Sequence, residues 1–268
     1  MKKIKLAAMF AAVMAMLGLS SCLDGDTNNI STGMEFVRNK GIAGYYNFEN
    51  SAGLNLVPTN QKQWAETSVT TPFVIIQFQY SPDSIKQNSK RLPITLQGMA
   101  AVKDAQYSLV NTEWANAPIY QAGLSAFPYF DKNNLFLGVQ YFVKTGSDGK
   151  LDAAEMGASH EFGLYCEKTE KESISGNSLV LYIQHQVKDL SLNKDRKSNT
   201  GFDYAHFSLM EAVNWYKGVK NDLPENLIIK YKVPGSMSGD DMLDYGKAKD
   251  VSTSLSIPYK KYFKDSAN

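Results

Sequence analysis

The stretch Leu179-Val180-Leu181-Tyr182-Ile183-Gln184-His185-Gln186-Val187 decides the fold class. Counting from Leu179, every second residue is apolar except His185, and the intervening positions become polar towards the end of the stretch. A period of two places alternate side chains on opposite faces of a β-strand. The spacing therefore predicts a strand with one buried face, and it makes His185 a hydrogen-bonded residue of the core.

The same alternation recurs along the chain, in segments separated by turn-forming Ser, Asp, Asn, Gly and Pro residues. These segments are residues 74–80, 92–96, 135–143, 162–166, 227–233 and 251–257. Many short strands with one polar face are typical of antiparallel sheets that have one side in water. We therefore expect an all-β protein.

A long stretch without alternation, residues 111–134, separates the strands into two groups. Irregular connections of this length are uncommon inside one compact domain. About five strands precede it, which suits a small barrel, and six or seven follow, which suits a sandwich. The sequence thus predicts an N-terminal β-barrel domain over residues 35–115 and a C-terminal β-sandwich domain over residues 116–268.

Near residue 208 the sequence is compatible with either a helix or a strand. Ser208 and Glu211 have the spacing of a capping box, and Ala212, Trp215 and Val219 recur at helical intervals. Alternatively, the residues around 207 and 209 finish a strand. The pattern alone leaves both interpretations open.

The first 22 residues are typical of a secretory signal. Three lysines precede an apolar run over residues 6–19, and small residues lead to Cys22. The run is shorter than the roughly 20 apolar residues of a membrane-spanning helix. We expect cleavage before Cys22, with residues 1–21 as a lipoprotein signal peptide, acyl chains on Cys22 and residues 22–34 as a flexible tether. The alternative is an ordinary signal peptide with a chance cysteine.

Several stretches carry a resemblance to a known family. Leu19-Ser20-Ser21-Cys22 resembles the bacterial lipobox, and the following residues 23–26 resemble the acidic signal of surface-exposed Bacteroidetes lipoproteins. Residues 73–80, and residues 179–186 followed by 227–232, resemble strands of the NigD-like lipoproteins of Bacteroidetes. The resemblance implies an OB-like N-terminal barrel, an Ig-like C-terminal sandwich and an outer-membrane location at the cell surface. The molecular function of that family is unknown, so the resemblance implies no activity.

Composition excludes several classes of protein. The 43% of apolar residues and the low net charge of +1 exclude a disordered chain. The same near-neutral charge gives no reason to predict nucleic-acid binding, which needs a basic surface. The two cysteines exclude a disulfide scaffold. Once Cys22 is acylated, Cys166 is the remaining thiol, and its position in a strand predicts a small buried hydrophobic residue.

The sequence contains only weak matches to catalytic and ligand-binding motifs. The loop at residues 144–155 aligns with a calcium loop around Gly149, but Lys144 and Gly146 stand where the first two carboxylate ligands belong. A hairpin without calcium affinity is expected. The three histidines lack the spacing of a zinc site, and no nucleophile or phosphate-binding motif is present in the sequence. We therefore expect no cofactor, no metal and no catalytic residues.

Aromatic residues outside the alternation are the remaining candidates for contact with a ligand: Trp64, Trp114, Trp215 and Tyr129. Such residues either recognise a partner or pack between domains.

The sequence therefore predicts a non-enzymatic lipoprotein, anchored in the outer membrane through Cys22, that binds an unknown protein or glycan. The alternatives are a glycan-active enzyme and a pilus-like structural subunit of the envelope.

Overall fold

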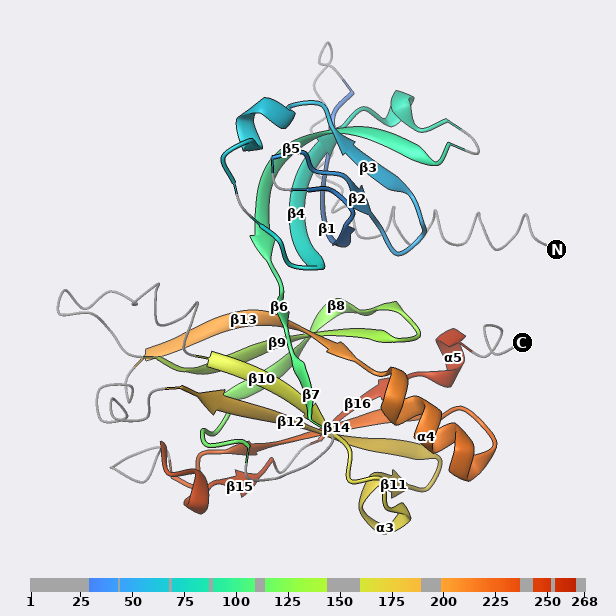
Figure 1. The fold of residues 1–268 in the computed structure, drawn as a ribbon. Helices are drawn as coiled ribbons and strands as arrows, with labels where there is room; N and C mark the ends of the chain where they lie inside the picture. The colour runs from blue at the N-terminus through green and yellow to red at the C-terminus, as the bar shows by residue number, and fades with distance from the viewer. Residues whose placement is uncertain are drawn as a thin grey trace. The chain divides into compact units, whose positions relative to one another are not determined.

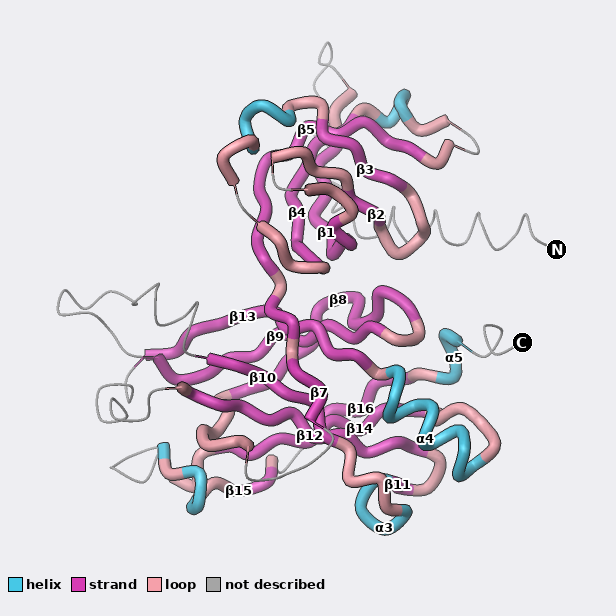
Figure 2. The backbone as a smooth tube through the Cα atoms, viewed as in Figure 1, coloured by secondary structure: helices cyan, strands magenta, loops and turns pink. Residues whose placement is uncertain are grey.

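The computed structural model describes residues 29–42, 44–67, 69–86, 89–108, 114–143, 160–188, 199–236, 243–251 and 254–263. Strands dominate these residues, which confirms the all-β expectation (Figure 2). The chain divides into two compact units, Met1–Val102 and Lys103–Asn268. Cys22 and the loop at residues 144–155 lie outside the described residues, so their roles stay predictions.

The elements of the first unit are β1 (Ser31–Asn39), β2 (Phe48–Glu49), β3 (Asn55–Pro58), η1 (Gln61–Trp64), β4 (Phe73–Tyr80), η2 (Pro82–Ser84) and β5 (Arg91–Ala101) (Figure 1). The five strands form a closed barrel in the order β1-β2-β3-β5-β4. β3 and β5 run parallel, and the other neighbours run antiparallel. The ring of pairings is closed, although β1 contacts β2 only at Arg38 and Asn39.

Buried and exposed side chains alternate along the strands, and the buried ones fill the barrel interior. In β4, Val74, Ile76 and Phe78 are buried, whereas Gln77 between them is exposed. A register shift in the pairing of β4 with β5 falls between Gln77 and Phe78. Such a bulge bends and twists a strand, which helps a five-stranded sheet to close.

The second unit contains β6 (Lys103–Asp104), β7 (Gln106–Ser108), β8 (Gln121–Asp131), β9 (Asn134–Val143), β10 (His160–Tyr165), α3 (Glu170–Ser173), β11 (Ile174–Ser175), β12 (Ser178–Val187), β13 (Asn199–Ser208), α4 (Met210–Lys220), β14 (Asn226–Val233), η5 (Tyr245–Lys247), β15 (Lys249–Asp250), β16 (Leu255–Pro258) and α5 (Lys260–Phe263). They form a four-stranded sheet, β6-β13-β9-β8, and a seven-stranded sheet, β15-β14-β12-β10-β7, with β11 beside β12 and β16 beside β14.

One hydrophobic core lies between these two sheets. It joins Leu135, Leu137 and Val139 of β9 to Leu179 and Leu181 of β12. The sheets are mixed, because β7–β10, β6–β13 and β12–β14 are parallel pairs. The expectation of antiparallel strands therefore fails at these pairs. Between β12 and β14 the chain passes through β13 of the other sheet and α4, so β14 enters in the same direction as β12.

The strand and the helix expected near residue 208 both exist, in succession. β13 ends at Ser208, and α4 begins at Met210 with Leu209 as its N-cap residue. The expected capping box is wrong, since no side chain caps this helix. Glu211 instead forms an ion pair with Lys168. Ala212, Val213 and Tyr216 form the buried side of the helix.

The division between the units lies earlier than the boundary expected at residues 115 and 116. β6 and β7 pair with β13 and β10, so the chain from Lys103 onwards belongs to the second unit. The stretch interpreted as a connection contains β8. Register shifts in its pairing with β9, between Leu124 and Tyr129 and again before Asp131, break the period of two that identifies strands in a sequence.

Candidate functional site

A cleft of about 520 Å³ lies within the second unit, over the seven-stranded sheet. It is lined by Tyr165, Glu167, Glu172, Tyr182, Ile183, Gln184, Tyr231, Lys232, Tyr245, Gly246 and Asp250. Its volume is in the range typical of small-molecule sites, about 300–1,000 Å³. We name this feature the tyrosine cleft.

Strand phase explains why Tyr165 and Tyr182 face the cleft. Leu179, Leu181 and Ile183 of β12 belong to the core, so Tyr182 and Gln184 project from the opposite face. Tyr165 of β10 pairs in register with Tyr182, and their ring centroids lie 6.3 Å apart. The two strands thus present neighbouring aromatic rings on the outer side of the sheet.

A second wall comes from η5 and β15. Tyr245, Gly246 and Asp250 line this side, and Asp244 accepts a hydrogen bond of 2.9 Å from the backbone N–H of Gly246. A Cβ on Gly235 would lie 2.1 Å from the carbonyl oxygen of Lys247. Glycine is therefore required where the chain just after β14 passes η5, and this close approach fixes the position of the wall.

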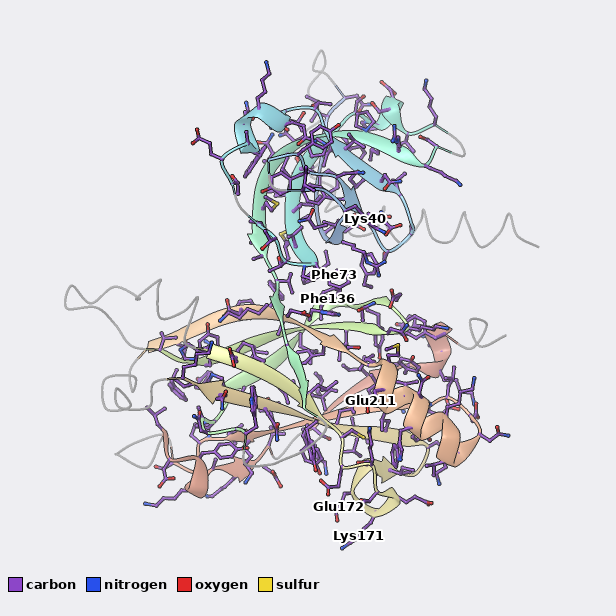
Figure 3. The ribbon with its side chains drawn as sticks, in the orientation of Figure 1. Lys40, Phe73, Phe136, Lys171, Glu172 and Glu211 are labelled. Atoms are coloured by element: carbon purple, nitrogen blue, oxygen red, sulfur yellow. The ribbon has the colours of Figure 1, made fainter. Side chains whose placement is uncertain are left out.

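Charges surround the rings. Lys232 is paired in register with Asp250, and its Nζ lies 5.2 Å from the ring centroid of Tyr245, within the range of a cation–π contact. Burial and the nearby carboxylate of Asp250 raise the pKa of Tyr245, so this phenol keeps its proton and can donate a hydrogen bond. Glu172 is carried by α3 (Figure 3).

The chemistry of this set suits binding. Aromatic faces cover apolar rings, while carboxylates accept hydrogen bonds and an ammonium group donates them. Among the described residues that line the cleft there is no His, Cys, Ser or Thr, which are the usual members of a nucleophile–base pair. The groups that could act as acids or bases are the carboxylates of Glu167, Glu172 and Asp250, the amino group of Lys232 and the phenols of the tyrosines.

A second polar cluster lies in the interior, around two histidines that are each 2% exposed. The carbonyl oxygen of Pro118 accepts from Nδ1 of His185 at 3.3 Å, and Nε2 of His185 lies 2.9 Å from Nδ1 of His160 in a hydrogen bond between the two rings. The ring of Tyr141 lies 4.2 Å from that of His160, and the Tyr141 hydroxyl donates to Asp203. This confirms His185 as a hydrogen-bonded core residue.

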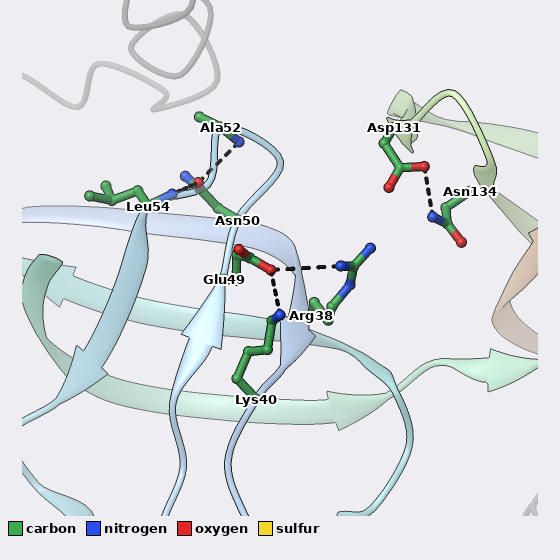
Figure 4. A network of polar contacts seen from close by, with 8 residues as sticks. All are labelled: Arg38, Lys40, Glu49, Asn50, Ala52, Leu54, Asp131 and Asn134. Carbon is green, nitrogen blue, oxygen red and sulfur yellow. Dashed lines mark hydrogen bonds and ion pairs between the residues drawn. The ribbon is translucent and has the colours of Figure 1, made fainter. Parts of the chain in front are cut away.

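The third histidine has partners that sequence spacing missed. His206 contacts the Asp104 carboxylate through Nδ1 at 2.6 Å and the Asn134 amide oxygen through Nε2 at 2.7 Å. Asn134 in turn donates to Asp131, as Figure 4 shows. Among the residues that the structure describes, no group of three or more His, Cys, Asp or Glu residues could hold a metal ion.

The aromatic residues proposed from sequence do not form one site. Trp64 packs against the barrel core, while Trp215 and Tyr129 pack against the sandwich core. Tyr129 donates a hydrogen bond of 2.9 Å to the carbonyl oxygen of Pro258. Trp114 is half-buried, and its carbonyl oxygen accepts from Gln186 at 3.1 Å.

Sequence reasoning missed the tyrosine cleft. The available signal was Tyr182, an aromatic residue at an outward position of a strand whose following outward positions are Gln184 and Gln186. Cys166, in contrast, is buried at 1% exposure, as its strand position predicted.

The fold is similar to that of proteins whose structures are solved. No family model matches the chain. No curated protein matches it either. A solved structure of a putative lipoprotein from Bacteroides fragilis is similar over 85% of this chain and 98% of that one, with 18% identity and a TM-score of 0.62. The chain shares the fold of this protein.

Two further solved structures are similar at lower identity. An uncharacterised protein from Parabacteroides merdae is 10% identical, over 85% of this chain and 99% of that one, with a TM-score of 0.50. A NigD-like immunity protein from Bacteroides caccae is 12% identical, over 84% and 97% of the two chains, with a TM-score of 0.47. The similarity to the Bacteroides fragilis structure agrees, at the level of fold, with the expected likeness to lipoproteins of Bacteroidetes. None of the three proteins is named as an enzyme.

Proposed function

We propose that this chain is a non-enzymatic lipoprotein of the outer membrane, exposed at the cell surface, that binds a glycan in the tyrosine cleft. The anchor is Cys22, preceded by a lipobox and an apolar run. The structural similarity to a putative lipoprotein supports the lipid anchor. In this proposal the signal peptide is removed and Cys22 carries acyl chains such as palmitate.

The observation that carries the binding proposal is the pairing of aromatic rings with carboxylates in one cleft. Tyr165 and Tyr182 offer neighbouring rings, and Lys232 and Asp250 lie on the next strands of the same sheet, β14 and β15. A sugar ring presents C–H groups on its faces and hydroxyl groups at its rim. Aromatic rings cover the former, and charged side chains form strong hydrogen bonds with the latter.

Truncation of Tyr182 tests the proposal. A panel of neutral, acidic and amino-sugar oligosaccharides is titrated calorimetrically into the wild-type protein and into Tyr182→Ala. Central aromatic residues of binding sites typically contribute 2 kcal/mol or more, so we expect at least about a 30-fold weaker binding by the variant. The matched control is Tyr262→Ala, because this side chain is 59% exposed and is not a residue of the cleft.

Two results would contradict the proposal. Equal affinities of wild type and Tyr182→Ala for every bound oligosaccharide would exclude the cleft as the site. Release of new reducing ends from an oligosaccharide, lost in Asp250→Asn, would show a glycan-active enzyme that uses the carboxylates of the cleft.

A further inference from the structure

The side chains that line the tyrosine cleft carry an excess of negative charge. Glu167, Glu172 and Asp250 are carboxylates, whereas Lys232 is the one cationic residue in the described lining. Counted as ionised, these four groups sum to a net charge of −2. The cleft therefore repels an anionic ligand and attracts a cationic one.

Two of these carboxylates are not neutralised by a neighbouring cation. Glu172 forms an ion pair with Lys171 at 3.6 Å, and α3 carries both residues (Figure 3). Within the described part of the chain, in contrast, neither Glu167 nor Asp250 takes part in an ion pair. Burial and the charge of Asp250 raise the pKa of Tyr245, so the field of this carboxylate reaches into the cleft.

The tyrosine rings of the cleft already contact ammonium groups of the chain itself. Lys232 Nζ lies 5.2 Å from the ring centroid of Tyr245, and Lys230 Nζ lies 5.7 Å from that of Tyr182. Both distances are within the roughly 6 Å of a cation–π contact. Lys230 is not a residue of the lining, and including its charge leaves the sum of the charges negative. The cleft therefore attracts cations through its ring faces as well as through its carboxylates.

Tyr165 adds a further ring to this surface. Its plane is inclined by 50° to that of Tyr182, at a centroid separation of 6.3 Å. Among the described residues, no cation lies over the ring of Tyr165, and Glu167 lines the same cleft. Inclined aromatic rings form the sides of the cages that hold ammonium groups.

A sugar with a free amine combines the features that this cleft recognises. Its C–H faces suit the rings, and its ammonium group donates strong hydrogen bonds to carboxylates. We infer that the glycan bound in the tyrosine cleft is an amino sugar whose amines are free and protonated, and whose ammonium groups bind the carboxylates of Glu167 and Asp250. This inference rests on the proposed function, to which it adds the class of glycan.

Two oligosaccharides that differ in charge test the inference. Oligomers of glucosamine and of N-acetylglucosamine, equal in length and linkage, are titrated calorimetrically into the wild-type protein at a slightly acidic pH. The amines of the first are protonated, whereas the amides of the second carry no charge. We expect the glucosamine oligomer to bind at least about tenfold more tightly, which is the order expected for one hydrogen bond to a charged group.

A double variant tests the role of the carboxylates. Glu167→Gln combined with Asp250→Asn removes two charges, and both side chains are exposed, so we expect the fold to be retained. The double variant should lose the preference for the free amine and keep the affinity of the wild type for the acetylated oligomer. The matched control is Glu170→Gln, because this exposed carboxylate of α3 does not line the cleft. The control should keep the full preference.

The outcomes separate this inference from the proposed function. Equal or tighter binding of the acetylated oligomer, lost in Tyr182→Ala, would overturn the inference and leave glycan binding in the cleft intact. A preference that persists undiminished in the double variant would also overturn it. Binding of trilysine as tight as that of the glucosamine oligomer would show recognition of charge without a sugar ring, and would contradict both. Absence of binding by every oligosaccharide would likewise contradict both.

Discussion

Glu35 gives the barrel a pH-dependent stability that one substitution should remove. This residue lies in β1 at the parity of the buried Gly33 and Val37, and burial raises the pKa of its carboxyl from 4.5 to about 7. A hydrogen bond from Asn50 opposes the shift without cancelling it. The same Asn50 is 2% exposed and accepts from the backbone N–H groups of Ala52 and Leu54 (Figure 4).

The sign of the effect follows from proton binding. Between pH 4.5 and 7 the folded barrel keeps the Glu35 proton while the unfolded chain releases it, so stability falls as the pH rises. Each pKa unit corresponds to about 1.4 kcal/mol, so the full change amounts to about 3.5 kcal/mol at most. Above pH 7 both states are ionised, and the contribution of this group becomes constant.

Glu35→Gln keeps the shape and the carbonyl acceptor but cannot ionise. We expect it to unfold at a higher urea concentration than the wild type at pH 8.5, and to differ little from it at pH 4.5. Trp64 packs against the barrel core, so its fluorescence reports on this unit once Trp114 and Trp215 are replaced by Phe in both proteins. Parallel loss of stability with pH in the wild type and in Glu35→Gln would refute the reasoning.

Three further predictions concern packing, backbone and metal binding. Leu181→Ala should lower the unfolding free energy of the sandwich by about 2–5 kcal/mol in urea titrations, because Leu181 is fully buried; a loss below about 1 kcal/mol would contradict its place in the core. Gly44→Ala should reduce barrel stability by about 1–3 kcal/mol, since φ is +79° and Ala65 lies close; an unchanged melting temperature would contradict the strained turn. Calcium should produce no heat of binding that depends on Asp148 in calorimetry, and a micromolar site lost in Asp148→Ala would show that the loop is a calcium site.

Local patterns determine how much of the fold can be predicted from this sequence. Period-two alternation identified β4, β9, β12 and β14, because side chains two residues apart share a face whatever the strand pairs with. The same rule missed β8, whose register shifts against β9 interrupt the alternation. The barrel and the two packed sheets agree with the expected kinds of domain, and the OB-like and Ig-like assignments stay predictions.

Strand partners and the candidate site could not be predicted, because both depend on contacts between distant residues. β12 pairs in parallel with β14, about 48 residues later, and nothing in either strand specifies that partner. The cleft gathers residues from Tyr165 to Asp250, and His206 finds its carboxylate 102 residues away at Asp104. Apart from Tyr182, an aromatic residue at an outward strand position, no sequence pattern distinguishes these side chains.

The location of the protein rests on Cys22, and one measurement tests it most directly. Among the described residues, no helix is long and apolar enough to cross a membrane. Cells expressing the wild type or Cys22→Ser are fractionated, and the membranes are washed with high salt and carbonate. The account predicts that the wild type stays with the membranes and that Cys22→Ser is released into the soluble fraction. A Cys22→Ser protein that remains with the washed membranes as completely as the wild type would contradict the lipid anchor.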